Sequence, residues 1–226
     1  MRLLFIHGSG FTSEIFARQV ARFPGALAPN LPGHASAGAG SSVAEFADFI
    51  EEYIRAHDLA DVVLCGNSLG GAIALEIGVR RNPAVRALAL IGSGSRLKVA
   101  PVFLEGLRDT FESTAREIAK FLYANPTPER VDDAWGSMQR VGQDQTLRDF
   151  LACNAFDLTE RLGELTLPVL ALAGESDLMT PPKYARALAD RIAGAQVQIL
   201  PQAGHLAMVE RPADTNEALI RFVATL

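Results

Sequence analysis

The stretch DVVLCGNSLGG at positions 61–71 decides how this chain folds. Its first half, 61–65, is a short apolar run that is typical of a buried parallel strand. The run leads into Gly-x-Ser-x-Gly, and a helical pattern over 69–81 follows at once. Gly66 and Gly70 lack the Cβ atoms that would collide in a sharp strand-to-helix turn. The pattern therefore predicts a strained turn that exposes the hydroxyl of Ser68.

Strand and helix patterns alternate on either side of this stretch. The apolar runs, each followed by a loop signal, are 3–6, 87–91, 169–173 and 197–200, with a weaker one at 26–28. Helical patterns cover 43–56, 182–193 and 212–225, and Ser42 with Glu45 forms a capping box before the first. The alternation predicts an α/β fold: a mostly parallel sheet of about six strands with helices on both faces.

The alternation breaks between Ile91 and Leu167, where about three helical segments follow one another without a strand. We interpret 95–164 as a helical lid inserted into a core formed by 1–94 and 165–226. Apolar side chains of the lid and of the neighbouring loops are candidate walls of a substrate pocket, and packing within a helical core is the alternative for each. The candidates are Gly10, Phe103, Trp135, Met138 and Met179.

Composition narrows the classes of partner. The 226 residues are 49% hydrophobic, which is enough for a substantial core, and the net charge is -5 with Lys and Arg scattered. Scattered charge argues against binding to nucleic acid or to anionic membranes. No apolar run reaches the roughly 18 residues of a membrane span, and we expect a cytoplasmic protein. Cys65 and Cys153 are expected to be buried free thiols, and no residue spacing predicts a metal site.

A serine hydroxyl needs a base that takes its proton, and the base needs a carboxylate that orients it. Loops after later strands of a parallel sheet supply such partners. Asp177 follows the run 169–173, and His205 follows the run 197–200. We therefore predict Ser68 as nucleophile, His205 as general base and Asp177 as the orienting acid, with Glu175 as the alternative acid.

The other three histidines lie elsewhere: His7 after the first strand, His34 in a Pro-Gly turn and His57 at the end of an exposed helix. An oxyanion hole needs two backbone donors aimed at the developing negative charge. We predict the amides of Leu69 and Ser9 as these donors, and prefer Ser9 to its neighbour in the loop after the first strand.

That loop also nearly matches a dinucleotide-binding fingerprint, as Gly8-x-Gly10-x-x-Ser13. The third glycine is a serine, however, and Asn30 stands where an acidic residue would bind a ribose. We expect no nucleotide cofactor.

Five motifs occur along the chain: His7-Gly8-Ser9-Gly10, Leu31-Pro32-Gly33-His34, Gly66-Asn67-Ser68-Leu69-Gly70-Gly71, Gly174-Glu175-Ser176-Asp177, and Gly204-His205 with Glu210-Arg211-Pro212. In these motifs and their order the sequence resembles the α/β-hydrolase superfamily. The resemblance implies a cofactor-free enzyme that cleaves esters, thioesters, lactones or amides, or occasionally C–C bonds. The chain departs from the family in starting at its third strand, without the opening hairpin, and in having Asn30 where an Asp is usual.

The resulting hypothesis is a small-substrate serine carboxylesterase that uses water and forms an acyl-enzyme on Ser68. One alternative is a C–C hydrolase of aromatic ring-cleavage products. Another is a ligand-binding receptor on the same fold, without turnover. We expect a monomer or a homodimer, since an exposed sheet edge is compatible with dimerisation.

Overall fold

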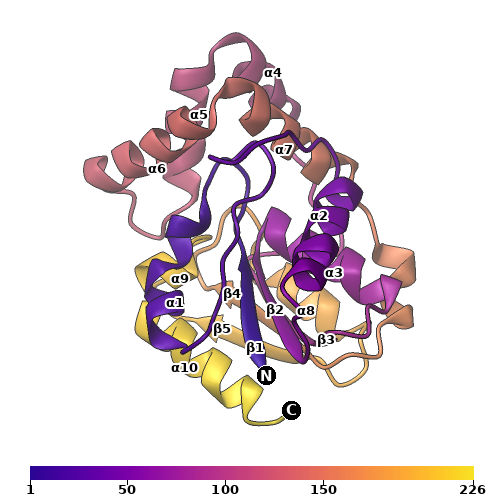
Figure 1. The fold of residues 1–226 in the computed structure, drawn as a ribbon. Helices are drawn as coiled ribbons and strands as arrows, with labels where there is room; N and C mark the ends of the chain where they lie inside the picture. The colour runs from indigo at the N-terminus through magenta and orange to yellow at the C-terminus, as the bar shows by residue number, and fades with distance from the viewer.

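Five parallel strands form the centre of the molecule (Figure 1). They are β1 (Arg2–Ile6), β2 (Val62–Asn67), β3 (Val85–Ile91), β4 (Val169–Gly174) and β5 (Gln196–Leu200). The strands pair in the order β1-β2-β3-β4-β5, with every pair parallel. This computed structural model describes residues 1–226. The predicted α/β class with a parallel sheet is confirmed.

The weak run at 26–28 does not become a sixth strand. It makes a single parallel bridge, Leu27 to Leu4, in which the Phe5 amide donates to the Leu27 carbonyl at 2.8 Å. Pro24 and Gly25 precede the run and Pro29 follows it, so the ladder has no amide with which to continue. The sheet therefore has five strands instead of about six.

Helices cover both faces of the sheet and its upper end. Those beside the sheet are α1 (Ala17–Arg22), α2 (Val43–Ala56), α3 (Leu69–Arg80), α8 (Lys183–Ala189), α9 (Ala207–Glu210) and α10 (Pro212–Val223), with 3-10 turns at Ser13–Phe16 and Thr159–Glu164. Four helices, not about three, lie between β3 and β4: α4 (Pro101–Asp109), α5 (Phe111–Phe121), α6 (Pro128–Val141) and α7 (Gln143–Ala155). Gly142, with φ 90°, separates α6 from α7.

The capping box before α2 forms in part. The Ser42 hydroxyl accepts a hydrogen bond from the Glu45 amide at 3.2 Å, as expected. The Glu45 carboxylate, however, accepts from the amide of Ser41, one residue earlier than the pattern predicts. The helix still begins at the expected position, Val43.

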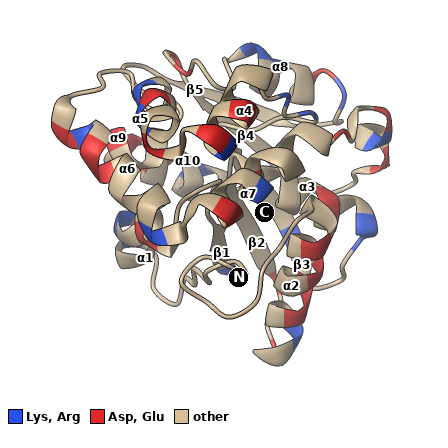
Figure 2. Cartoon of the chain, turned by 90° about the horizontal axis from the view of Figure 1, so that it is seen from above, with Lys and Arg blue, Asp and Glu red and all other residues tan.

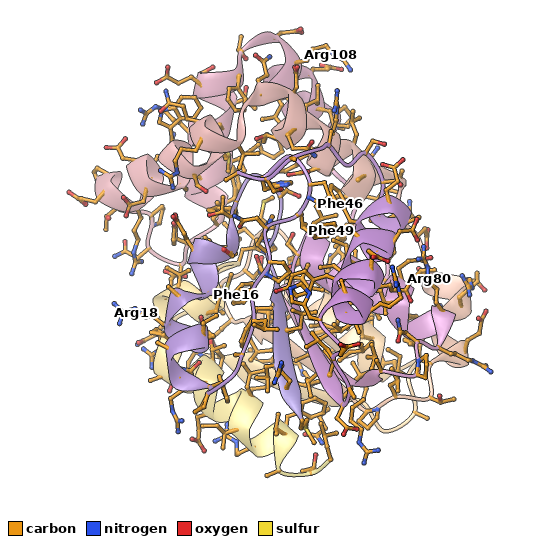
Figure 3. The ribbon with its side chains drawn as sticks, viewed as in Figure 1. Phe16, Arg18, Phe46, Phe49, Arg80 and Arg108 are labelled. Atoms are coloured by element: carbon orange, nitrogen blue, oxygen red, sulfur yellow. The ribbon has the colours of Figure 1, made fainter.

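Alternate residues of each strand enter two separate cores. Leu4, Leu64 and Ala171 pack with the side chains of α2, α3 and α8. Phe5 and Val63 pack on the other face, with α10 and with helices of the 101–155 segment. Figure 3 shows Phe16 and Phe46 turned inward and Arg18 and Arg108 turned outward. Burial on both faces explains why β1 to β4 are nearly continuous apolar runs, whereas the edge strand β5 is partly exposed and alternates with Gln.

The helices α4–α7 lie beyond the carboxyl ends of the strands, where the loops after β1, β2, β4 and β5 also meet (Figure 1). Seen from this side, acidic and basic residues are interspersed over the helices (Figure 2). None of the helices has both the length and the apolar character needed to cross a bilayer.

Candidate active site

The turn between β2 and α3 holds Ser68 in a strained backbone conformation. Its φ is 53° and its ψ is -114°, a region that non-glycine residues rarely adopt. A Cβ on Gly66 would overlap the Gly70 carbonyl, and a Cβ on Gly70 would overlap the Ile6 carbonyl. Both glycines are therefore required, as the sequence predicts. The Ser68 side chain lines a pocket to which side chains of α6 and α7 also contribute.

The loops after β4 and β5 bring Asp177 and His205 together. Nδ1 of His205 lies 3.0 Å from Oδ2 of Asp177, and the two side chains are 3% and 0% exposed. The amides of Met179 and Thr180 both donate to Oδ1 of Asp177 at 2.8 Å. The Thr180 hydroxyl donates to Oδ2 at 2.9 Å. These contacts fix both the carboxylate and the ring that faces it.

The surroundings of Asp177 favour its charged form. Burial by itself raises the pKa of this carboxyl. The charge and hydrogen bond of His205 and the two Thr180 hydrogen bonds lower the pKa by more than burial raises it, so the net pKa lies below its usual range. An ionised Asp177 can accept a hydrogen bond from the Nδ1–H of His205, which leaves Nε2 of the neutral ring unprotonated and able to act as a base. The alternative acid, Glu175, is exposed to solvent and makes no hydrogen bond to His205.

Two backbone amides near Ser68 remain without a protein acceptor. Neither the Ser9 amide nor the Leu69 amide donates a hydrogen bond within the protein. The amide of Gly10, by contrast, donates to Oδ2 of Asp149 at 2.9 Å. The first two amides are therefore free donors, whereas the Gly10 amide is already occupied.

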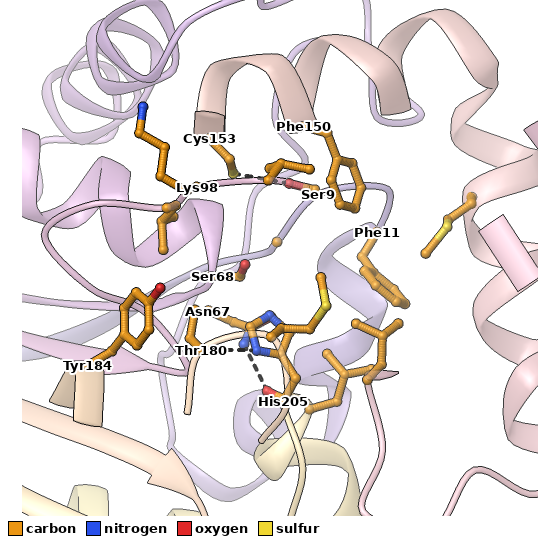
Figure 4. A pocket seen from close by; sticks show the side chains of 17 residues that line it. Ser9, Phe11, Asn67, Ser68, Lys98, Phe150, Cys153, Thr180, Tyr184 and His205 are labelled. Atoms are coloured by element: carbon orange, nitrogen blue, oxygen red, sulfur yellow. Dashed lines mark hydrogen bonds between the residues drawn. The ribbon is translucent and has the colours of Figure 1, made fainter. Parts of the chain in front are cut away.

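The pocket has a largely apolar lining around Ser68 (Figure 4). Phe11 and Phe150 lie on one side of the serine, and Tyr184 and Lys98 lie on the other. The full lining is Gly8, Ser9, Phe11, Asn67, Ser68, Leu97, Lys98, Val99, Leu122, Met138, Phe150, Cys153, Met179, Thr180, Tyr184, His205 and Leu206.

Of the predicted pocket walls, Met138 and Met179 belong to this lining. Trp135 of α6 instead packs edge-on against Phe111 of α5, with ring centroids 5.3 Å apart. Phe103 likewise packs against Phe121, at 5.7 Å, and Gly10 is not part of the lining. Helical spacing alone does not distinguish a side chain that faces a pocket from one that faces a neighbouring helix.

Several residues of the site were not found from the sequence. Thr180 holds Asp177, and the Asn67 amide group donates to the carbonyls of Ile91 and His205 at 3.1 and 3.3 Å. Gly92 has φ 53°, and a Cβ there would lie 3.1 Å from Nδ1 of His205. The one sequence signal for these residues is the Pro-Pro pair after Thr180, which is typical of an ordered loop. The contacts of Asn67 and Gly92 join segments far apart in the chain, so no local pattern indicates them.

One of the two thiols, Cys153, lines the pocket and lies 3.5 Å from the Ser9 hydroxyl. Cys65 and Cys153 are free and buried, as predicted, and burial raises the pKa of Cys153 to about 12. The structure contains no cluster of three or more His, Cys, Asp or Glu side chains that could hold a metal ion.

Known proteins similar to this chain include hydrolases and esterases. A family model described as the alpha/beta hydrolase family matches residues 3–218. A pimeloyl-[acyl-carrier protein] methyl ester esterase of Neisseria meningitidis is 31% identical over 225 residues, covering 90% of this chain and 85% of the relative. A solved thermophilic esterase is 31% identical with a TM-score of 0.90, covering 99% of this chain and 89% of that one.

Another relative is named for a dienoate substrate. The 2-hydroxy-6-oxo-6-phenylhexa-2,4-dienoate hydrolase of Comamonas testosteroni is 28% identical over 178 residues, covering 71% of this chain and 62% of the relative.

Proposed function

Because the chain belongs to the α/β hydrolase family, we propose that it is a serine hydrolase that cleaves small or medium carboxylic esters, thioesters or lactones. In this proposal Ser68 is the nucleophile, His205 the general base and Asp177 the acid that orients it. The observation that carries it is the buried His205–Asp177 pair at 3.0 Å, in the same pocket as the strained Ser68.

Acylation follows from this arrangement. Nε2 of His205 takes the hydroxyl proton as Oγ of Ser68 attacks the ester carbonyl carbon. The C–O bond to the leaving group then breaks, and the imidazolium gives its proton to the departing alcohol. The structure has no hydrogen bond between the Ser68 hydroxyl and His205, whose Nδ1 faces Asp177, and we expect this contact to tighten in the substrate complex.

Deacylation repeats these steps with water. His205 takes a proton from a water molecule, whose oxygen attacks the acyl carbon. The bond to Oγ of Ser68 breaks, and the serine recovers the proton from His205. The products are a carboxylic acid and an unmodified enzyme.

The free amides support the choice of oxyanion donors. The Leu69 and Ser9 amides have no protein acceptor, while the Gly10 amide is held by Asp149. We therefore assign the oxyanion hole to Leu69 and Ser9. Each such donor contributes about 10²–10³ in turnover in serine hydrolases.

The pocket lining favours esters over ring-cleavage dienoates. A dienoate carries a carboxylate, which needs a cation or several donors once it is buried. Lys98 is the only lysine or arginine of the lining; it is exposed to solvent, and its amine points away from Ser68 and donates to the Asn154 carbonyl at 2.8 Å (Figure 4). The apolar remainder, with Phe11 and Phe150, fits an uncharged acyl group.

The test uses p-nitrophenyl esters from acetate to decanoate, with wild type, Ser68→Ala and the exposed control Ser113→Ala. We expect wild type and Ser113→Ala to turn over with one optimal chain length, and Ser68→Ala to lose on the order of 10⁴–10⁶ in kcat while remaining folded. Near-normal turnover by Ser68→Ala would refute the assignment. Cleavage of a dienoate but not of esters would favour the C–C hydrolase, and a stoichiometric adduct with no turnover of any substrate would favour the receptor.

A further inference from the structure

The molecule contains a second buried His–Asp pair that the proposed reaction does not use. Nε2 of His34, in the turn before α2, lies 2.7 Å from Oδ2 of Asp149 on α7. Both side chains are 0% exposed. Burying a His–Asp pair has a desolvation cost that apolar side chains do not have, so its presence calls for an explanation beyond stability.

Asp149 reaches from the lid to the loop that carries Ser9. Its Oδ2 accepts from the Gly10 amide at 2.9 Å as well as facing His34. Its Oδ1 accepts from the side-chain amide of Gln145, one turn earlier on α7, at 2.9 Å. Gly10 has φ 71°, so the chain turns sharply where the carboxylate holds it. The peptide between Ser9 and Gly10 is therefore fixed by a helix 139 residues further along the chain.

His34 fixes the carboxylate in turn. Its Nδ1 faces the Pro32 carbonyl at 3.1 Å, while its Nε2 faces Asp149. A carbonyl oxygen only accepts, so Nδ1 donates to Pro32, and Nε2 shares a hydrogen bond with the Asp149 carboxyl group. The ring also packs on His7, with centroids 4.6 Å apart, and His7 accepts from the Leu31 amide. The ring is thus held at both nitrogens and on one face.

A second contact from α7 reaches the same loop independently. Oγ of Ser9 lies 3.5 Å from Sγ of Cys153, which is one helical turn beyond Asp149. Helix α7 therefore contacts the side chain of Ser9 through Cys153 and the backbone amide of Gly10 through Asp149. The Ser9 amide itself donates to no protein group.

We propose that Asp149 and His34 are positioning residues for the oxyanion hole. They hold the Ser9–Gly10 peptide so that the Ser9 amide stays directed at the developing charge on the substrate, and they make this geometry depend on the seating of α7. The inference rests on the proposed function. Preorganised donors stabilise a transition state without reorganising, so a loosened loop slows the chemical step more than it weakens ground-state binding.

The test compares Asp149→Asn and His34→Asn with Asp144→Asn, which makes the same change at an exposed position on the same helix. We expect kcat/KM for a p-nitrophenyl ester to fall about 10- to 100-fold in the first two, less than for complete loss of a donor. We expect affinity for a trifluoromethyl ketone, which forms a hemiketal on Ser68, to fall by a similar factor. Affinity for the matching methyl ketone should stay within about threefold. Asp144→Asn should match wild type throughout.

Wild-type kinetics and ketone affinities in folded Asp149→Asn and His34→Asn would overturn the proposal. Equal losses for both ketones would also overturn it, because a merely structural role distorts the whole pocket. If one variant fails to fold, the other decides; if neither folds, the pair is structural and the proposal fails. The Ser68→Ala variant keeps the two proposals apart. Its turnover would refute the hydrolase assignment, whereas a dead Ser68→Ala beside a normal Asp149→Asn would refute only the positioning role.

Discussion

His7 is a histidine whose protonation is strongly suppressed by the fold. Burial first, and the neighbouring His34 second, lower the pKa of His7 from 6.5 to about 3, although its hydrogen bond to the Gly8 carbonyl opposes them. Its Nε2 accepts from the Leu31 amide at 3.0 Å, which requires the neutral ring. A neutral His7 thus joins the loop after β1 to the turn that carries His34.

The lowered pKa of His7 predicts that the protein loses stability in mild acid. Above pH 6.5 His7 is neutral in both states and makes no pH-dependent contribution. As the pH falls from 6.5 toward 3 the unfolded chain binds a proton that the folded chain refuses, so the free energy of unfolding drops by up to about 1.4 kcal/mol per pH unit. His7→Gln, which keeps an acceptor for the Leu31 amide, should lose about 1–2 kcal/mol less than wild type between pH 6.5 and 5 in urea titrations.

The control for this prediction is His57→Gln, a substitution at the exposed end of α2. It should retain the pH dependence of wild type. Equal losses in wild type and His7→Gln would mean that His7 does not titrate differently on folding.

At the scale of elements, Glu210 at the end of α9 connects the His205 loop with the lid. Its side chain is 3% exposed and accepts from the Gly204 amide at 2.7 Å and from the Ala124 amide at 3.1 Å. Arg130 of α6 donates to it at 2.8 Å. One carboxylate therefore serves three donors from three segments.

Glu210→Gln should destabilise the protein by about 1–3 kcal/mol, because an amide group has one acceptor oxygen and leaves a buried N–H without a partner. Urea unfolding measures the loss. Glu217→Gln on α10, which breaks an exposed ion pair with Arg221, should cost less than about 0.5 kcal/mol. Similar losses in both variants would show that the Glu210 contacts contribute no more than a surface pair.

At the scale of the whole molecule, the division into a core and a lid at 95–164 remains a prediction from the sequence. The lid helices do not pack by themselves: Trp135 and Phe150 share one apolar cluster with Phe5 and Val63 of the sheet. Segments that share a buried core lose it together, so we expect them to unfold in a single cooperative transition.

The single Trp of the chain makes this testable, since Trp135 lies on α6 and its fluorescence reports on the lid alone. Far-UV circular dichroism reports on the helices of both parts. The two urea midpoints should coincide in wild type. A fluorescence transition at clearly lower urea would show that the lid unfolds independently and would support an autonomous domain.

The sequence by itself determined the parallel α/β fold, the strained turn at Ser68 and the order of Ser68, Asp177 and His205. Short local patterns of the sequence indicate these features, because a buried parallel strand is a short apolar run and a sharp turn needs glycine at fixed positions. The same patterns overestimated the number of strands in the sheet, because Pro29 ends the run at 26–28 after a single bridge.

Only the tertiary structure decided which polar groups are paired. It placed His34, which the sequence puts in an ordinary turn, against Asp149, 115 positions away. It also turned Trp135 into the lid and Met138 into the pocket. The physical reason is that helical periodicity gives the buried side of a helix but not its neighbour, and a hydrogen bond between distant segments depends on how the elements pack.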